Sequence, residues 1–165
     1  MNNVLLQTRI RVLIVFFMVA LSISGLTAIP LVWEVKILKT LFGNGTGLAL
    51  FMPYLSEWIE RVYLGITETA ASHPFMLYGT DWLAFAHVVI AIAFIGPLRD
   101  PVKNIWVIEF GMIACMLLIP WGIIFGMVRE IPPFWSLIDF SFGVFGFIPL
   151  WYVRKSILQM KLAGN

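Results

Sequence analysis

Three ionisable side chains lie inside otherwise apolar stretches of this chain: His87, Glu109 and Asp139. A histidine near a carboxylate can exchange protons, bind a cation or form a hydrogen bond between helices. An ionisable group at membrane depth is costly, so it usually faces protein or water instead of lipid. These residues are therefore the first candidates for a functional site, although their spacing assigns no catalytic residue.

The neighbours of two of these residues favour helix packing. His87 shares a helical face with alanines such as Ala84, and Asp139 shares one with Ser136 and Gly143. Small residues allow close approach of a second helix. From the expected helix starts, each ionisable group is about 9 Å along its helix, at 1.5 Å per residue. We therefore predict that His87 and Asp139 lie close together, directly or through water.

Three interpretations of this pair stay open. It can be a structural contact between helices, which in membranes contributes about 0.6 kcal/mol on average. It can belong to a proton, ion or substrate route, with Glu109 as a port at the opposite end. The third interpretation of the His87–Asp139 pair is metal or haem ligation. Glu109 has an alternative of its own: an interfacial ion pair with a basic residue that reaches it by snorkelling.

Secondary candidates lie near the ends of the apolar stretches: Asp81, His73, Arg129 and Glu130. A metal site near His73, His87 and Asp139 is chemically permissible, but no compact ligand spacing supports it. A haem held by two histidines is not expected, because His73 lies outside the apolar stretches. The sequence therefore predicts no cofactor.

Composition places the chain in a membrane. Hydrophobic residues make up 61% and charged residues 12%, about half the charged share of ordinary soluble domains. The net charge of +2 favours neither a nucleic acid nor an acidic substrate. The single cysteine, Cys115, excludes an internal disulfide and has the character of a small buried hydrophobe.

Four apolar stretches have the length of membrane-spanning helices. Backbone groups find no water in a bilayer, so these spans must be helical. We predict an all-α, integral membrane four-helix bundle, formed by one transmembrane domain over residues 1–165. The predicted spans are 12–33, 82–98, 105–128 and 134–153.

A long connection, residues 34–80, separates the first two spans. It contains a glycine-rich turn at Gly43–Gly47, followed by a segment with helical apolar spacing that begins near Pro53. Proline suits the first turn of a helix. We predict a short amphipathic helix on the outer membrane surface, which either caps the bundle or docks a partner.

Basic residues predict the orientation of the spans. One side of the membrane receives most of those in short loops and flanks: Arg9, Arg11, Arg99, Lys103, Arg154, Lys155 and Lys161. This asymmetry predicts cytoplasmic termini and an outer connection on the opposite face. We expect a bacterial inner (plasma) membrane.

The sequence leaves three functions open. The first is a non-catalytic subunit or accessory protein of a larger membrane complex, packed against other subunits or against copies of itself. The second is a proton, ion or small-molecule transport module that uses His87, Asp139 and Glu109. The third is a membrane enzyme acting on a lipid or quinone-like substrate at the outer leaflet. The scarcity of chemical groups favours the first and argues against an enzyme.

Overall fold

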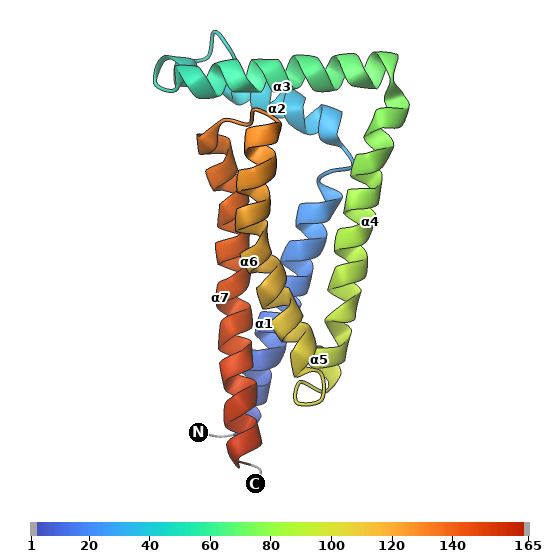
Figure 1. Ribbon diagram of the computed structural model, residues 1–165, viewed down its shortest axis with the longest axis vertical. Coiled ribbons are helices and arrows are strands. Elements are labelled where there is room, and N and C mark those ends of the chain that lie inside the picture. The colour runs from blue at the N-terminus through green and yellow to red at the C-terminus, as the bar shows by residue number, and fades with distance from the viewer. Residues whose placement is uncertain (1–2, 164–165) are drawn as a thin grey trace. The chain divides into compact units, whose positions relative to one another are not determined.

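The structure is a computed structural model that describes residues 3–163, with side chains for residues 5–162. All of its regular elements in that range are helical (Figure 1). The α-helices are α1 (Asn3–Leu26), α2 (Leu31–Phe42), α3 (Pro53–Ser72), α4 (Tyr78–Ala93), α5 (Ile95–Arg99), α6 (Ile105–Val128) and α7 (Pro133–Ala163). Two short 3-10 helices, η1 (Gly47–Leu50) and η2 (Pro74–Leu77), precede α3 and α4.

Four helical stretches in the described part of the chain are long and apolar enough to cross a membrane. They are Leu5–Leu26, Pro74–Arg99, Ile105–Val128 and Pro133–Leu162. The all-helical class and the number of spans agree with the sequence prediction. These features are those expected of a membrane protein.

At the first two predicted spans, the helices have different bounds from those predicted. The first was expected to reach Trp33, but α1 ends at Leu26 and a turn separates it from α2. Pro30 is the residue before α2, where its missing amide proton breaks the helical hydrogen bonding. The second span begins earlier than predicted, because η2 leads directly into α4 at Tyr78.

At the third predicted span, the helix has the same bounds as the prediction, since α6 runs from Ile105 to Val128. The fourth begins within one residue of its prediction, but α7 continues ten residues beyond the predicted end, to Ala163. A helix satisfies its own backbone groups in water as well as in lipid, so charged residues do not end it. The α7 extension includes Arg154, Lys155 and Lys161.

The chain forms two compact units. The hairpin unit is Ser22–Val88, and the core unit combines Met1–Leu21 with Val89–Asn165. The prediction of a single domain over residues 1–165 stays a prediction.

In the hairpin unit, α2 and α3 pack side by side and lie across the direction of α4 (Figure 1). We call this pair the α2–α3 hairpin (Leu31–Ser72). The helix expected near Pro53 is present as α3, which buries Ile59 and Ser56. The sequence prediction missed α2, although its inward residues Leu31, Val35, Leu38 and Phe42 recur at helical spacing.

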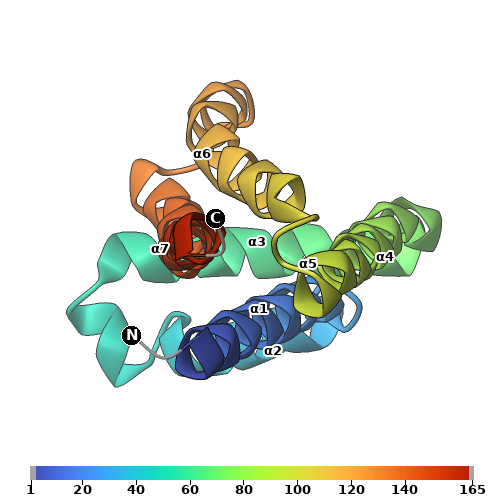
Figure 2. The same cartoon turned by 90° about the horizontal axis from the view of Figure 1, so that it is seen from below.

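In the core unit, α6 and α7 lie beside each other in both views (Figure 1, Figure 2). A cluster of buried side chains from α1, α6 and α7 surrounds Phe94, which is fully buried. The rings of Phe94 and Phe17 lie 4.8 Å apart between centroids. The buried members of this cluster are Leu6, Ile10, Ile14, Phe17, Phe94, Val107, Ile108, Leu150, Val153 and Ile157.

Candidate functional site

His87 faces another helix, as the small residues around it predicted. A Cβ atom added to Gly25, in the last turn of α1, would overlap Cβ of His87 and lie 3.4 Å from the carbonyl oxygen of Ala84. Nδ1 of His87 lies 2.8 Å from the carbonyl oxygen of Leu83, one turn earlier. A proton on Nδ1 would donate to that oxygen and leave Nε2 as the acceptor. His87 is therefore a packing residue with one nitrogen available.

Asp139 lies at the margin of the helix face on which the sequence placed it. Ser136 and Gly143 of that face do pack on α6, but Asp139 itself is exposed. The next residue, Phe140, occupies the facing position, where its ring would lie 2.6 Å from a Cβ on Gly122. The spacing of small residues thus predicted the contact face of α7 but placed Asp139 one position too close to its centre.

The predicted pairing of His87 with Asp139 stays a prediction, because the two residues belong to different units. The expected starts of their helices need one correction. From the sequence, Thr80 is the expected N-cap of the helix that carries His87. It lies instead inside α4, and its hydroxyl donates to the carbonyl oxygen of Leu77 at 2.6 Å. His87 is consequently about 13 Å from its helix start, whereas Asp139 is about 9 Å from the start of α7.

Glu109 forms the ion pair that the sequence offered as one interpretation. Nε of Arg154, on α7, donates to Oε1 of Glu109, on α6, at 2.8 Å. Both side chains are 40% exposed. Lys103 and Lys155, the other two residues that the sequence allows as partners of Glu109, have different contacts. Lys103 lies 3.6 Å from Asp100, and Lys155 lies over the ring of Trp151. The Glu109–Arg154 pair therefore joins the beginning of α6 to α7, nine residues before the end of α7.

The secondary candidates on the hairpin unit lie at helix ends. Asp81 is exposed in the first turn of α4, where a negative charge interacts favourably with the helix dipole. His73 is exposed at the C-terminal cap of α3, and its ring contacts the edge of Phe75 at 6.0 Å between centroids. Both residues therefore have local structural roles.

Arg129 and Glu130 form the turn that ends α6. Arg129 is the C-cap, and Glu130 has the left-handed backbone conformation, with φ of 55°. The amide of Ile131 donates to the carbonyl oxygen of Gly126 at 2.9 Å, and that of Glu130 to Met127 at 3.4 Å. This is the Schellman hydrogen-bond pattern, which closes a helix end.

Metal ligation has no further support from the described residues. In residues 3–163, no three His, Cys, Asp or Glu side chains group together as metal ligands do. The metal site near His73, His87 and Asp139 stays a hypothesis.

Sequence reasoning missed a polar network that closes the α2–α3 hairpin. Lys39 lies 2.9 Å from Oε2 of Glu60, and Oε1 of Glu60 accepts the amide of Asn44 at 3.2 Å. The hydroxyl of Ser56 donates to the side-chain oxygen of Asn44 at 2.9 Å. A Cβ on Gly43 would overlap the carbonyl oxygen of Lys39. The sequence signal that could have revealed this network is the glycine-rich turn at Gly43–Gly47, which directly follows the helix that carries Lys39.

Acid is expected to loosen this hairpin. The hydrogen bond from Lys39 holds the pKa of Glu60 below its usual 4.5, although partial burial opposes the shift. A depressed carboxylate pKa stabilises the fold at higher pH, and this contribution is lost as pH falls through the folded-state pKa. Spin labels at Ile37 and Leu64 should give a narrow distance distribution at pH 7 that broadens below pH 4.5.

Two variants check the assignment to Glu60. Glu60→Gln should give the broad distribution already at pH 7, with no further acid response. Glu57→Gln, at an exposed position of the same helix, should behave like the wild type. An acid response that persists in Glu60→Gln would place the titrating group elsewhere.

Comparison with known proteins gives no match: no protein family, no curated protein and no solved structure matches the chain.

Proposed function

We propose that this protein is a non-catalytic accessory subunit of a larger membrane assembly, and that it contacts its partner through the tip of the α2–α3 hairpin. The tip comprises residues 48–54. The observation that carries the proposal is the exposure of its large apolar side chains. Leu50 and Phe51 are each 84% exposed and Tyr54 is 78% exposed. Contiguous apolar surface of this kind marks contact with another protein or with a membrane.

Charge favours a protein over a lipid surface at this tip. Helices that lie in membrane interfaces are usually rich in lysine and arginine on their polar side. α3 instead carries three glutamates and one arginine, and α2 adds one glutamate and two lysines. A net acidic hairpin gains little from anionic lipids. Exposed Phe and Tyr are also typical of protein interfaces.

The intramembrane polar groups support a structural role better than a chemical one. Glu109 is engaged by Arg154, and His87 packs on Gly25 with Nδ1 directed to its own helix. The transport alternative needs Glu109 as a port, and the ion pair weakens that role. No observation favours the lipid or quinone enzyme.

The proposal includes an arrangement in the membrane. The four spans form a bundle in a bacterial inner membrane, with both termini in the cytoplasm. The α2–α3 hairpin then lies on the outer face, where α3 is the amphipathic helix of the long connection. The asymmetry of lysine and arginine in the short loops supports this orientation.

Photo-crosslinking in intact cells tests the partner. Benzoylphenylalanine at Phe51 should give one adduct with a different protein, of defined mass. The same group at Leu64 of α3, which is 59% exposed, is the matched control and should not give that adduct. Leu50→Glu should weaken recovery of the complex about tenfold or more, as substitution of a central contact residue does.

Three outcomes would contradict the proposal. Phe51 could give only lipid adducts, which would make the tip a membrane anchor. The adduct could have twice the mass of the chain, which would indicate self-association. Equal adducts from Phe51 and Leu64 would show that the tip is not a specific surface.

A further inference from the structure

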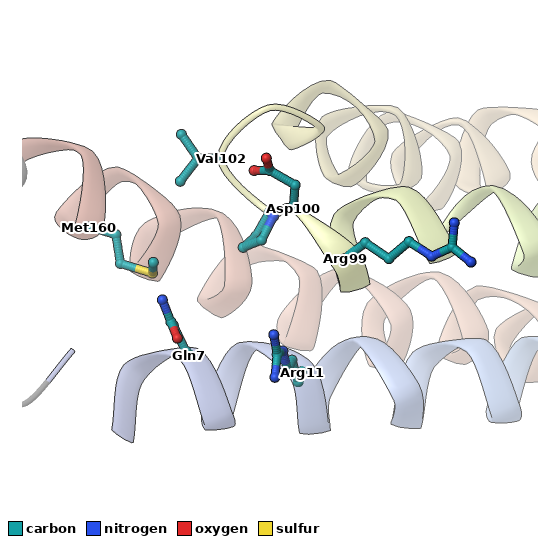
Figure 3. Close-up of a pocket in the computed structure, with 7 residues that line it drawn as sticks. Gln7, Arg11, Arg99, Asp100, Val102 and Met160 are labelled. Atoms are coloured by element: carbon teal, nitrogen blue, oxygen red, sulfur yellow. The ribbon is translucent and has the colours of Figure 1, made fainter. Parts of the chain in front are cut away.

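A small pocket lies in the core unit (Figure 3). Its volume is about 250 Å³. Gln7 and Arg11 line it from α1, Arg99 comes from the end of α5, and Asp100 from the following turn. Val102 and Met160 supply its apolar side. The pocket is thus lined by two arginines and a side-chain amide on one side and by apolar side chains on the other.

Among the side chains that the structure describes, no carboxylate forms an ion pair with Arg11 or Arg99. Asp100 is engaged elsewhere: its Oδ1 accepts the amide of Lys103 at 3.0 Å, and its Oδ2 lies 3.6 Å from the Lys103 ammonium. Figure 3 shows the Asp100 carboxylate and the Arg99 guanidinium pointing in different directions. With two arginines and one aspartate among its lining residues, the pocket carries a net positive charge.

The position of the pocket along the spans is also informative. Arg11 lies near the start of the first span, Arg99 ends the second, and Met160 lies near the end of the fourth. Three span ends therefore meet at this pocket. The ends of spans lie outside the hydrocarbon, at the lipid headgroups or in the water just beyond them.

We propose that this pocket binds a phosphate group, carried by the headgroup of an anionic phospholipid or present as free phosphate. Guanidinium groups bind phosphate oxygens through paired, charge-assisted hydrogen bonds. Basic pockets between spans on the cytoplasmic side bind anionic headgroups. The volume is below the roughly 300–1,000 Å³ of pockets for drug-sized ligands, which suits a headgroup better than a larger substrate.

Each lining group has a role in this site. Arg11 binds the phosphate from α1, and the amide of Gln7, one turn earlier on the same helix, donates to a further oxygen. Arg99 is exposed and long, so it can turn toward the bound anion. Val102 and Met160 exclude water from one side. In the lipid case, the acyl chains lie along the apolar surface of the adjoining spans.

Native mass spectrometry of the full-length protein tests the site. Phosphatidylglycerol should be retained in preference to phosphatidylcholine, with its binding weakened at least tenfold in Arg11→Gln/Arg99→Gln. Arg9→Gln is the matched control, because Arg9 is an exposed arginine of α1 that does not line the pocket. Arg11→Lys/Arg99→Lys keeps both charges but loses the planar guanidinium groups. We therefore expect it to weaken phosphatidylglycerol binding less than Arg11→Gln/Arg99→Gln does, but more than Arg9→Gln does.

Inorganic phosphate, titrated in phosphatidylcholine nanodiscs, forms the second arm. Saturable binding that depends on Arg11 and Arg99 would support the site with free phosphate as its ligand. Binding of phosphatidylglycerol alone would support the site with a lipid as its ligand. The proposal is overturned if neither probe binds, or if Arg9→Gln weakens binding as much as the double variant.

Discussion

Replacing Gly25 with alanine is expected to destabilise the protein by about 1–3 kcal/mol, the usual cost of forcing an extra group into a packed contact. The new methyl group would overlap Cβ of His87 and lie 2.7 Å from its Cγ. Since Cβ belongs to the backbone frame of α4, rotating the imidazole cannot relieve the overlap. α1 and α4 must therefore separate locally, and unfolding in mixed detergent micelles should show the loss.

Two further variants isolate this contact. Gly79→Ala, at a position of α4 with nothing within 4 Å, should be neutral or more stable by up to about 1 kcal/mol. In a His87→Gly background, Gly25→Ala should cost about 0.5 kcal/mol or less, because both overlapping atoms are gone. If Gly25→Ala unfolds as the wild type does, the helices do not meet at this point.

The second large effect is expected at Gly143, where α7 packs on α6. A Cβ at this position would lie 2.8 Å from the carbonyl oxygen of Cys115, a backbone atom that cannot move aside. Gly143→Ala should therefore cost about 1–3 kcal/mol of unfolding free energy. Trimming Cys115 to alanine should not restore stability, since the obstructing oxygen remains.

Gly146 provides the contrasting case on the same helix. A Cβ there would meet the Sγ atom of Cys115 at 2.9 Å, so the obstruction is a side chain. Cys115→Ala should rescue Gly146→Ala but not Gly143→Ala, as measured by the unfolding midpoint of each double variant. Gly126→Ala, whose nearest atom is the Ser136 hydroxyl at 3.2 Å, should cost less than either. Rescue of both variants would show that α7 is rotated from the position described.

Hydropathy predicted the number of spans and the bounds of α6, because polar residues flank α6 on both sides. It could not place the end of α1, since the apolar run continues through Pro30 to Trp33 while the helix does not. It also could not separate α2 from the first span. Hydropathy measures whether the side chains of a segment are compatible with lipid. Pro30 interrupts the helix because it lacks a backbone amide proton, which hydropathy does not take into account.

For the candidate site, the sequence predicted which helix faces make contacts, but not which residues they contact. Small residues correctly placed His87 against another helix, but nothing in the spacing identified Gly25 as the contact. At Asp139 the same reasoning failed by one position, because Phe140 fills the space left by Gly122. Complementary shapes on separate helices carry no short-range pattern, so a single sequence does not reveal them.

The length of α7 has a practical consequence for fusion proteins. Its 31 residues extend about 46 Å, whereas a bilayer measures about 30 Å across its hydrocarbon and 40–45 Å with its headgroups. An upright α7 that starts at one hydrocarbon boundary ends about 10 Å beyond the far headgroups. A fluorescent reporter fused after this helix would start in water on a rigid stalk, so it would fold clear of the membrane without a flexible spacer.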